Sequence, residues 1–247
     1  MFAAGLLLLS DQMAMQRAVD VVANNIANSS TTGFKREGIQ FSSFISHGSS
    51  ASEEKTAYVS DRATYRDITP GTISSTGNAL DLAIQGPGYF QIQTPQGTKY
   101  TRDGAFRTDN QGQIVTSTGM PVLSDANQSI TLPEDARDIT ISGDGYITAQ
   151  VGTGSSRAQL GKIGVVSFAN EQQVTPVGGG LSATTQIPTP VAGNAIVQGA
   201  IEESNVQSVS EITDLIRLQR AYEQASTLIS AENTRLNTAL DRLSQTT

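Results

Sequence analysis

The chain of 247 residues contains no cysteine, no tryptophan and a single histidine. The missing cysteines exclude disulfide bonds, thiolate zinc sites and cysteine nucleophiles. The one histidine, His47, lies in a serine-rich stretch with no carboxylate at ligand spacing, which argues against a metal or catalytic role. We find neither clustered carboxylates nor a catalytic triad. The sequence therefore predicts no catalytic residues, no metal site and no cofactor, and we expect the protein not to be an enzyme.

Basic residues are also scarce, since 16 Lys and Arg stand against 23 Asp and Glu and the net charge is −7. Nucleic-acid binding needs a basic surface, so we expect no nucleic-acid partner. No apolar run approaches the roughly 20 residues of a membrane-spanning helix, so we expect no direct membrane insertion. The start "MFAAGLLLLS" has the length of a signal-peptide core. However, no positive charge precedes it and the helical pattern continues beyond it, so we expect no cleavage.

Aromatic residues make up only 5 % and charged residues 16 % of the chain, while glycines number 23. This composition favours β structure with many turns over a charge-rich helical bundle. Between residues 80 and 168, short alternating segments such as "LDLAIQ", "GYFQIQ" and "DITISGDGYITA" are separated by turn residues, among them Asp103-Gly104 and Asp144-Gly145. Regularly spaced strands with no helical segment between them predict an antiparallel all-β domain.

Both ends of the chain show helical periodicity instead. The N-terminal pattern runs to about Asn28, where Ser, Thr and Asn compete for backbone hydrogen bonds and Gly33 can take a positive φ. The C-terminal pattern predicts a helix from near Ser208 to about residue 243, and Ser208 with Glu211 fits a capping box. The repeating apolar positions of the two helices are Met15, Val19, Val22 and Ile26, and then Leu215, Leu218, Tyr222, Ile229, Leu236 and Leu243.

The sequence thus predicts an α+β fold. Long N- and C-terminal α-helices pack as a coiled-coil-like pair, and an antiparallel all-β domain is inserted between them. We predict five segments: an N-terminal helix at 1–30, an extended connector at 31–78, the β domain at 79–173, a Pro- and Gly-rich return connector at 174–204 and a C-terminal helix at 205–247. The pattern leaves open whether the two helices pack only within one molecule or complete their burial against other subunits.

Three stretches carry a family resemblance. "VDVVANNIANSSTTGFKRE", residues 19–37, closely resembles the N-terminal signature of the bacterial flagellar axial proteins of the rod and hook. "ALDLAIQGPGYFQIQTPQGTKYTRDGAFRTDNQGQIVTSTGMPVL" is similar to the family's central β motif, and "EESNVQSVSEITDLIRLQRAYEQASTLI" to its C-terminal helix signature. The first stretch matches the family at Ala23, Asn24, Asn25, Ile26, Ala27, Asn28, Thr31, Gly33, Phe34 and Lys35.

The resemblance implies a structural subunit of the flagellar basal-body rod. Such subunits polymerise helically with copies of themselves and with other rod subunits into a drive shaft that transmits motor torque for motility. They leave the cytoplasm through the flagellar type III export apparatus without a cleaved signal peptide, and the rod spans the periplasm. The start and the tail of this chain look more like the proximal-rod type. A distal-rod protein of the same family and a secreted, oligomeric glycan-binding module are the alternatives.

The resemblance and the periodicity together predict a set of subunit-interface residues. We expect the side-chain amides of Asn24 and Asn25 to bond neighbouring backbones or helices, Asn28 to end the helix, and Phe34 to lie at a subunit contact. The charged run Lys35-Arg36-Glu37 is expected to be solvated. The predicted interface residues are Met15, Val19, Val22, Asn24, Asn25, Ile26, Phe34, Leu215, Leu218, Tyr222, Ile229, Leu236 and Leu243.

Overall fold

A computed structural model of the chain describes residues 2–46, 56–152, 157–191, 193 and 195–244. Within these ranges, side-chain burial is described for residues 9–40 and from residue 64 onward, except at 236, 240, 243 and 244. The chain forms two compact units, and each is described by itself. Unit 1 comprises Met1–Ala27, Glu37–Asp67 and Gln207–Thr247, and unit 2 comprises Asn28–Arg36 and Ile68–Val206.

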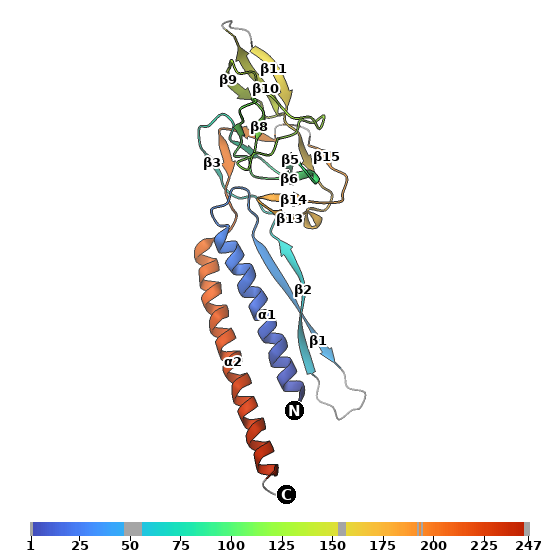
Figure 1. Ribbon diagram of the computed structural model, residues 1–247, viewed down its shortest axis with the longest axis vertical. Helices are drawn as coiled ribbons and strands as arrows, with labels where there is room; N and C mark the ends of the chain where they lie inside the picture. Colours follow the sequence, from blue (N-terminus) through green and yellow to red (C-terminus); the bar gives the residue numbers. More distant parts are fainter. Residues whose placement is uncertain (1, 47–55, 153–156, 192, 194, 245–247) are drawn as a thin grey trace. The chain divides into compact units, whose positions relative to one another are not determined.

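Unit 1 contains the two long helices. Helix α1 (Phe2–Ala27) and helix α2 (Ser208–Ser244) lie side by side in Figure 1 and contact one another. Both helices begin and end close to the predicted residues, and Gly33 beyond α1 has the expected positive φ of 67°. Among the described residues, neither helix offers a stretch long and apolar enough to cross a bilayer.

The buried positions of the helices follow the periodicity of the sequence. Ala14, Ala18, Val22 and Asn25 are the buried residues described on α1, and their spacing of four, four and three places them on one face. On α2, buried and half-buried side chains recur at similar spacing from Glu211 onward.

Unit 1 also contains a pair of strands that pack against α1 (Figure 1). Strand β1 (Glu37–Ser46) pairs antiparallel with β2 (Thr56–Arg66), and the register shifts at Gln40/Phe41. These residues lie in the segment for which the sequence predicted an extended connector. Their backbone is extended, but the two stretches pair with each other along their whole length. Serine obscures this in the sequence because it interrupts the apolar and β-branched residues that signal a strand.

Unit 2 consists of short strands, and every pairing described in it is antiparallel, as predicted. The largest sheet has the order β13-β14-β6-β5-β12-β15, a second has the order β11-β10-β9, and the remaining strands form the pairs β16-β4, β17-β3 and β7-β8 (Figure 1). The strands are β3 (Ile73–Ser75), β4 (Leu82–Ile84), β5 (Tyr89–Thr94), β6 (Gly97–Thr101), β7 (Arg107–Thr108), β8 (Ile114–Val115), β9 (Ala136–Ile141), β10 (Tyr146–Val151), β11 (Arg157–Lys162), β12 (Val165–Ser167), β13 (Thr175–Gly178), β14 (Leu181–Ala183), β15 (Thr189–Pro190), β16 (Ile196–Gln198) and β17 (Ala200–Glu202).

The core of unit 2 is aliphatic with an aromatic pair at its centre. Phe90 has no exposed surface, and its ring meets that of Phe106 edge-on at 5.0 Å. Backbone segments cross close to this core: a Cβ atom at Gly104 would lie 1.7 Å from the carbonyl oxygen of Leu82. The Asp103-Gly104 dipeptide was predicted as a turn but has no turn in the structure; it marks instead a point where only glycine fits. Asp144-Gly145 forms the predicted turn between β9 and β10, with Gly145 at φ 88°.

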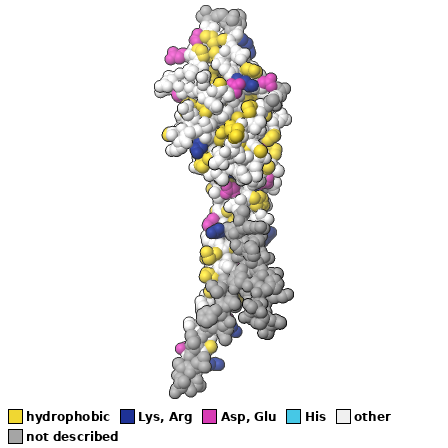
Figure 2. Space-filling view, turned by 90° about the vertical axis from the view of Figure 1, so that its right-hand side faces the viewer, with side chains coloured by type: hydrophobic (Ala, Val, Ile, Leu, Met, Phe, Trp, Pro, Cys, Tyr) yellow, Lys and Arg dark blue, Asp and Glu magenta, His cyan; other side chains and the backbone are white. Residues whose placement is uncertain are grey.

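Charged side chains are dispersed over unit 2. On the face shown in Figure 2, dark blue and magenta side chains are scattered among hydrophobic ones, without a patch of a single sign. This face therefore lacks the basic stripe of a nucleic-acid-binding surface.

Candidate functional site: helix surfaces and two buried polar clusters

The predicted interface residues on α1 fall into two groups. Val22 and Asn25 are buried within unit 1 of the single chain, and their place at a subunit interface stays a prediction. Met15, Val19 and Ile26 are half-buried, and Asn24 is exposed. The pattern of the sequence identified the apolar side of the helix, but it could not separate the residues covered by the chain itself from those left open.

The predicted residues on α2 lie on the side of the helix that is partly covered. Leu215, Leu218, Tyr222 and Ile229 are half-buried, whereas Leu236 and Leu243 lie outside the described side chains. The heptad pattern thus identified the side of α2 that is partly covered in the single chain. That face is incompletely covered in the single chain, and its role in contacts between subunits stays a prediction.

Several apolar side chains outside the predicted set are strongly exposed on the helices. On α2, Val209 is 81 % exposed and Ile212 and Ile216 are 46 % exposed each, at spacings of three and four that place them on one side. On α1, Leu9 and Met13, four residues apart, are 49 % and 60 % exposed. The interface set predicted from the sequence omitted all five, because its selection followed a single heptad line on each helix.

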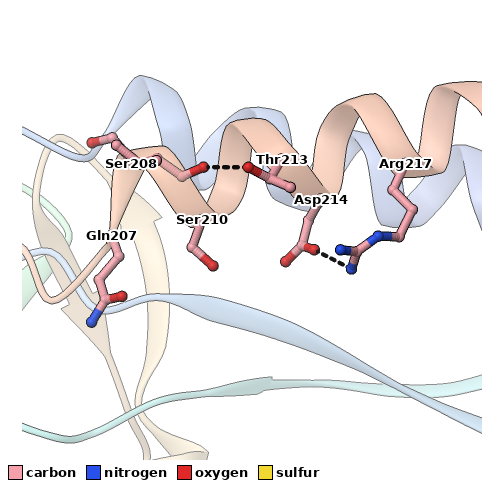
Figure 3. A pocket seen from close by; sticks show the side chains of 7 residues that line it. Gln207, Ser208, Ser210, Thr213, Asp214 and Arg217 are labelled. Atoms are coloured by element: carbon pink, nitrogen blue, oxygen red, sulfur yellow. Dashed lines mark hydrogen bonds and ion pairs between the residues drawn. The ribbon is translucent and has the colours of Figure 1, made fainter.

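A shallow groove of about 740 Å³ begins at the start of α2, lined by residues 207–210, 213, 214 and 217. Figure 3 shows that its lining side chains are mostly polar, with Asp214 and Arg217 joined by an ion pair of 3.0 Å. The Thr213 hydroxyl donates to the carbonyl of Val209 at 2.9 Å. A helix surface with exposed Val209 and a rim of paired charges has the character of a protein-contact surface rather than of a catalytic pocket.

Asn25 forms the centre of a buried polar cluster in unit 1. Its Oδ1 accepts a hydrogen bond from the Glu37 amide at 2.9 Å, and its Nδ2 donates to the Glu37 carbonyl at 2.8 Å and to Glu211 Oε2 at 3.1 Å. Asn25 and Glu211 are 0 % and 1 % exposed. One side chain thereby pairs with the first residue of β1 and with the first turn of α2. The amide of Asn25 does bond a neighbouring backbone and helix, as expected, but within its own chain.

A second polar cluster lies in unit 2 and consists of Lys35, Arg102 and Glu202. Lys35 Nζ contacts Glu202 Oε1, and Arg102 Nε donates to Glu202 Oε2 at 2.9 Å. The side chains of all three are at most 5 % exposed. This corrects the expectation for Lys35, which is buried rather than part of a solvated run. The reason is a partner 167 residues away, which no local pattern reveals.

The remaining donors of this cluster bind backbone carbonyls. Lys35 Nζ donates to the Thr69 carbonyl at 2.8 Å, and Arg102 donates to the carbonyls of Gly88 and Gly86 at 2.6 and 2.8 Å. Buried charges are tolerated only when they are paired and hydrogen-bonded in this way. Two cations share one carboxylate, so the cluster depends more on Glu202 than on either cation.

Burial and the excess of two cations over one carboxylate shift the pKa values of Lys35 and Glu202. Burial lowers the pKa of Lys35, with a contribution from the charge of Arg102, although the bond to Glu202 acts in the opposite direction. Burial on its own would raise the pKa of Glu202. However, Arg102, Lys35 and the amide of Gly71 together hold that pKa below its usual value. Glu202 is therefore ionised at neutral pH and compensates the two cations.

Gly33 connects the first sequence motif to this cluster. Its amide donates to the Glu202 carbonyl at 2.7 Å, and a Cβ atom at this position would lie 2.6 Å from the carbonyl carbon of Arg102. Its φ of 67° is also one that glycine tolerates best. The neighbouring Phe34 is half-buried in unit 2, and its predicted subunit contact stays a prediction. Nowhere in the described part of the chain do three or more His, Asp or Glu side chains gather as metal ligands.

Comparisons with known proteins match three parts of the chain to family models. The model described as flagella basal body rod protein matches residues 9–35. The model of the flagellar hook protein FlgE/F/G D1 domain matches 83–149, and that of the flagellar basal body rod FlgEFG protein C-terminal matches 197–242. These matches overlap the three stretches that carried the resemblance in the sequence.

Individual relatives extend the similarity over almost the whole chain. The chain is 36 % identical over 239 residues to the flagellar basal-body rod protein FlgF of Caulobacter vibrioides, and the alignment covers 95 % of both chains. It is 38 % identical over 245 residues to FlgG of Agrobacterium fabrum, covering 88 % of this chain and 90 % of that protein. Identity alone does not separate the two types, but similarity of this extent confirms the predicted family: the chain belongs to the flagellar basal-body rod proteins, which are structural proteins and not enzymes.

Proposed function

We propose that this protein is a subunit of the proximal rod that assembles with copies of itself and with other rod subunits into a helical polymer transmitting motor torque. The observation that carries the proposal is the incomplete burial of the terminal helices. Apolar side chains remain exposed on the outer sides of both helices of unit 1, notably Met13 and Val209. Covering one such side chain fully contributes about 1.5–3 kcal/mol, so several of them together favour association.

The position of these side chains supports an open polymer. The exposed apolar residues of α1 and those of α2 form two separate sets on one unit. A contact in which one set of one copy meets the other set of the next copy is heterologous, and repeated heterologous contacts build helical filaments rather than closed dimers. The half-buried heptad positions of α2 support the coiled-coil-like pairing of the helices, because other helices can complete their burial.

The extent of two FlgF alignments supports the proximal type, although a third, with FlgF of Mesorhizobium japonicum, covers 90 % of this chain and 89 % of that protein, no more than the alignment with FlgG of Bacillus subtilis. The Caulobacter vibrioides and Rhizobium meliloti FlgF proteins align over 95 % of this chain and 95 % of their own length. The FlgG proteins of Agrobacterium fabrum and Bacillus subtilis cover 88 % and 91 % of this chain. A distal-rod role is the alternative, because FlgG relatives reach 38 % identity. The position of the chain in isolated basal bodies, determined by cryo-electron microscopy, decides between the two.

The proposal includes the organisation predicted from the sequence. Residues 1–30 and 205–247 form the helical part through which subunits assemble, and an inserted β domain around residues 79–173 lies between the connectors. The subunit passes through the flagellar type III export apparatus without cleavage of a signal peptide, and it acts in the part of the rod that spans the periplasm. The motifs shared with rod proteins support this route.

The substitution Ile216→Asp tests the proposed assembly surface. Ile216 is 46 % exposed, so a charge there leaves the single chain folded but places a carboxylate in the subunit contact. We expect a cell that lacks its own copy of this protein to regain motility with the parent chain and to lose it with Ile216→Asp. Rods isolated from the variant cells should lack the protein.

Thr234→Asp serves as the matched control. Thr234 is also exposed on α2, but outside the apolar set at the start of the helix, and the substitution adds the same charge. Circular dichroism of both purified variants checks that the helices remain intact. Full motility with Ile216→Asp would contradict the assembly surface, and failure of the parent chain to restore motility would contradict the rod function itself.

A further inference from the structure

Four peptide connections join the two units, at Ala27–Asn28, Arg36–Glu37, Asp67–Ile68 and Val206–Gln207. They lead into three segments of unit 2: the first is residues 28–36, with a connection at each end, the second begins at Ile68 and the third ends at Val206. The side chain of Asn205, in the third segment, contacts the other two. Its Oδ1 accepts a hydrogen bond from the Arg36 amide at 2.7 Å, and its Nδ2 donates to the Thr69 carbonyl at 3.0 Å.

Backbone hydrogen bonds join the same three segments. The Asn205 amide donates to the Phe34 carbonyl at 3.3 Å, which pairs the third segment with the first. The Glu203 amide donates to the Thr72 carbonyl at 2.8 Å, which pairs the third segment with the second. The approach is so close that a Cβ atom at Gly71 would lie 1.9 Å from the Glu203 carbonyl oxygen. No side chain fits between the second and third segments there.

The buried carboxylate of Glu202 contacts the other two segments as well. Its Oε1 contacts Lys35 of the first segment and accepts a hydrogen bond from the Gly71 amide of the second at 3.0 Å. Its Oε2 accepts from Arg102, which is bound in turn to the carbonyls of Gly86 and Gly88 beside β5. Glu202 thus links all three segments to the loops around the core of unit 2.

We propose that Lys35, Glu202 and Asn205 form a clamp that holds the three segments together, so that the segments open as one cooperative set and not one by one. Replacement of Glu202 by glutamine removes the charge that compensates two buried cations. It also places an amide NH2 group, which cannot accept a hydrogen bond, opposite either Lys35 and the Gly71 amide or Arg102. The buried link of the first and second segments to the third is thereby weakened. Under the proposed rod function, on which this consequence rests, torque that enters unit 2 through any one connection is shared by all three segments.

Hydrogen exchange of the purified full chain, measured by mass spectrometry, tests the clamp with Glu202→Gln. We expect amides in the peptides covering residues 28–36, 68–72 and 202–206 to exchange about tenfold faster or more, and all three to accelerate together. Amides of β5 and β6 should retain their parental rates. Glu203→Gln is the matched control, because it makes the same change at the adjacent, exposed residue, and it should match the parent throughout.

Faster exchange of β5 and β6 would show that Glu202→Gln unfolds the whole of unit 2. In that case a second variant, Asn205→Ala, tests the clamp. Asn205→Ala removes the side-chain hydrogen bonds to Arg36 and Thr69 at the partly exposed edge of the cluster and leaves the ion cluster intact. It should accelerate exchange in residues 28–36 and 68–72 together. Acceleration of one segment alone, or of none, would overturn the clamp. Because the measurement uses the unassembled chain, its failure is independent of the assembly test with Ile216→Asp.

Discussion

Replacement of Asn25 by alanine tests how unit 1 is held together. The side chain has no exposed surface and makes three hydrogen bonds of 2.8 to 3.1 Å, two to the backbone of Glu37 and one to Glu211. Leaving a buried group without its hydrogen bond costs about 1–3 kcal/mol, and more for a charged group. Alanine recovers about 0.5 kcal/mol through its better helix propensity. The expected loss of unfolding free energy is therefore about 2–4 kcal/mol.

Urea unfolding followed by far-ultraviolet circular dichroism measures this loss. Both long helices belong to unit 1, so the helical signal reports on that unit and not on the strands of unit 2. The neighbouring Asn24→Ala is the matched control: Asn24 is exposed, and its replacement should change the free energy by no more than about 0.5 kcal/mol. A loss below about 1 kcal/mol for Asn25→Ala, or equal losses for both variants, would refute the structural role derived for Asn25.

Two further predictions concern unit 2. Because the pKa of Glu202 is lowered on folding, the unfolded chain takes up its proton first as the pH falls. The stability that Glu202 contributes is thus present above about pH 4.5 and lost below it, and Glu202→Gln should flatten the dependence of the urea midpoint on pH in this range, whereas an unchanged slope contradicts the assignment. Gly104→Ala should destabilise the unit by about 3 kcal/mol or more in thermal unfolding, since its Cβ would lie 1.7 Å from the Leu82 carbonyl oxygen. Gly119→Ala, at positive φ but with open space around its Cβ, should cost only about 1 kcal/mol, and equal losses would count against the contact.

The sequence was sufficient for the features that depend on local patterns. Helix α1 ends where polar residues and Gly33 follow the apolar positions, and α2 begins at Ser208, near the start that the sequence predicted. The turn at Asp144-Gly145 and the antiparallel pairing of unit 2 also follow from short-range signals. Strands β1 and β2 were not identified as a pair, because the serines of β1 and the charged residues of β2 weaken the alternation on which strand prediction depends.

The two polar clusters could not be predicted from the sequence, for a different reason. Asn25 and Glu211 are 186 residues apart, and Lys35 and Glu202 are 167 apart. The residues around each of these positions give no sign that the side chain is buried. Lys35 even belongs to a charged run, and such runs are usually solvated. Only the fold brings the partners together, and burial then converts ordinary surface residue types into paired, structural ones.

The two clusters explain why the three separate motifs belong together. The ion cluster of unit 2 takes Lys35 from the first motif, Arg102 from the second and Glu202 from the third, and the polar cluster of unit 1 takes Asn25 from the first and Glu211 from the third. The polar residues of the motifs therefore serve the internal architecture of one subunit. The apolar side chains on the outer sides of α1 and α2 are not needed for it, since they remain exposed in the single chain. This division leaves the helix surfaces open for contacts between subunits, while the connections that would carry torque are held by charges buried inside each subunit.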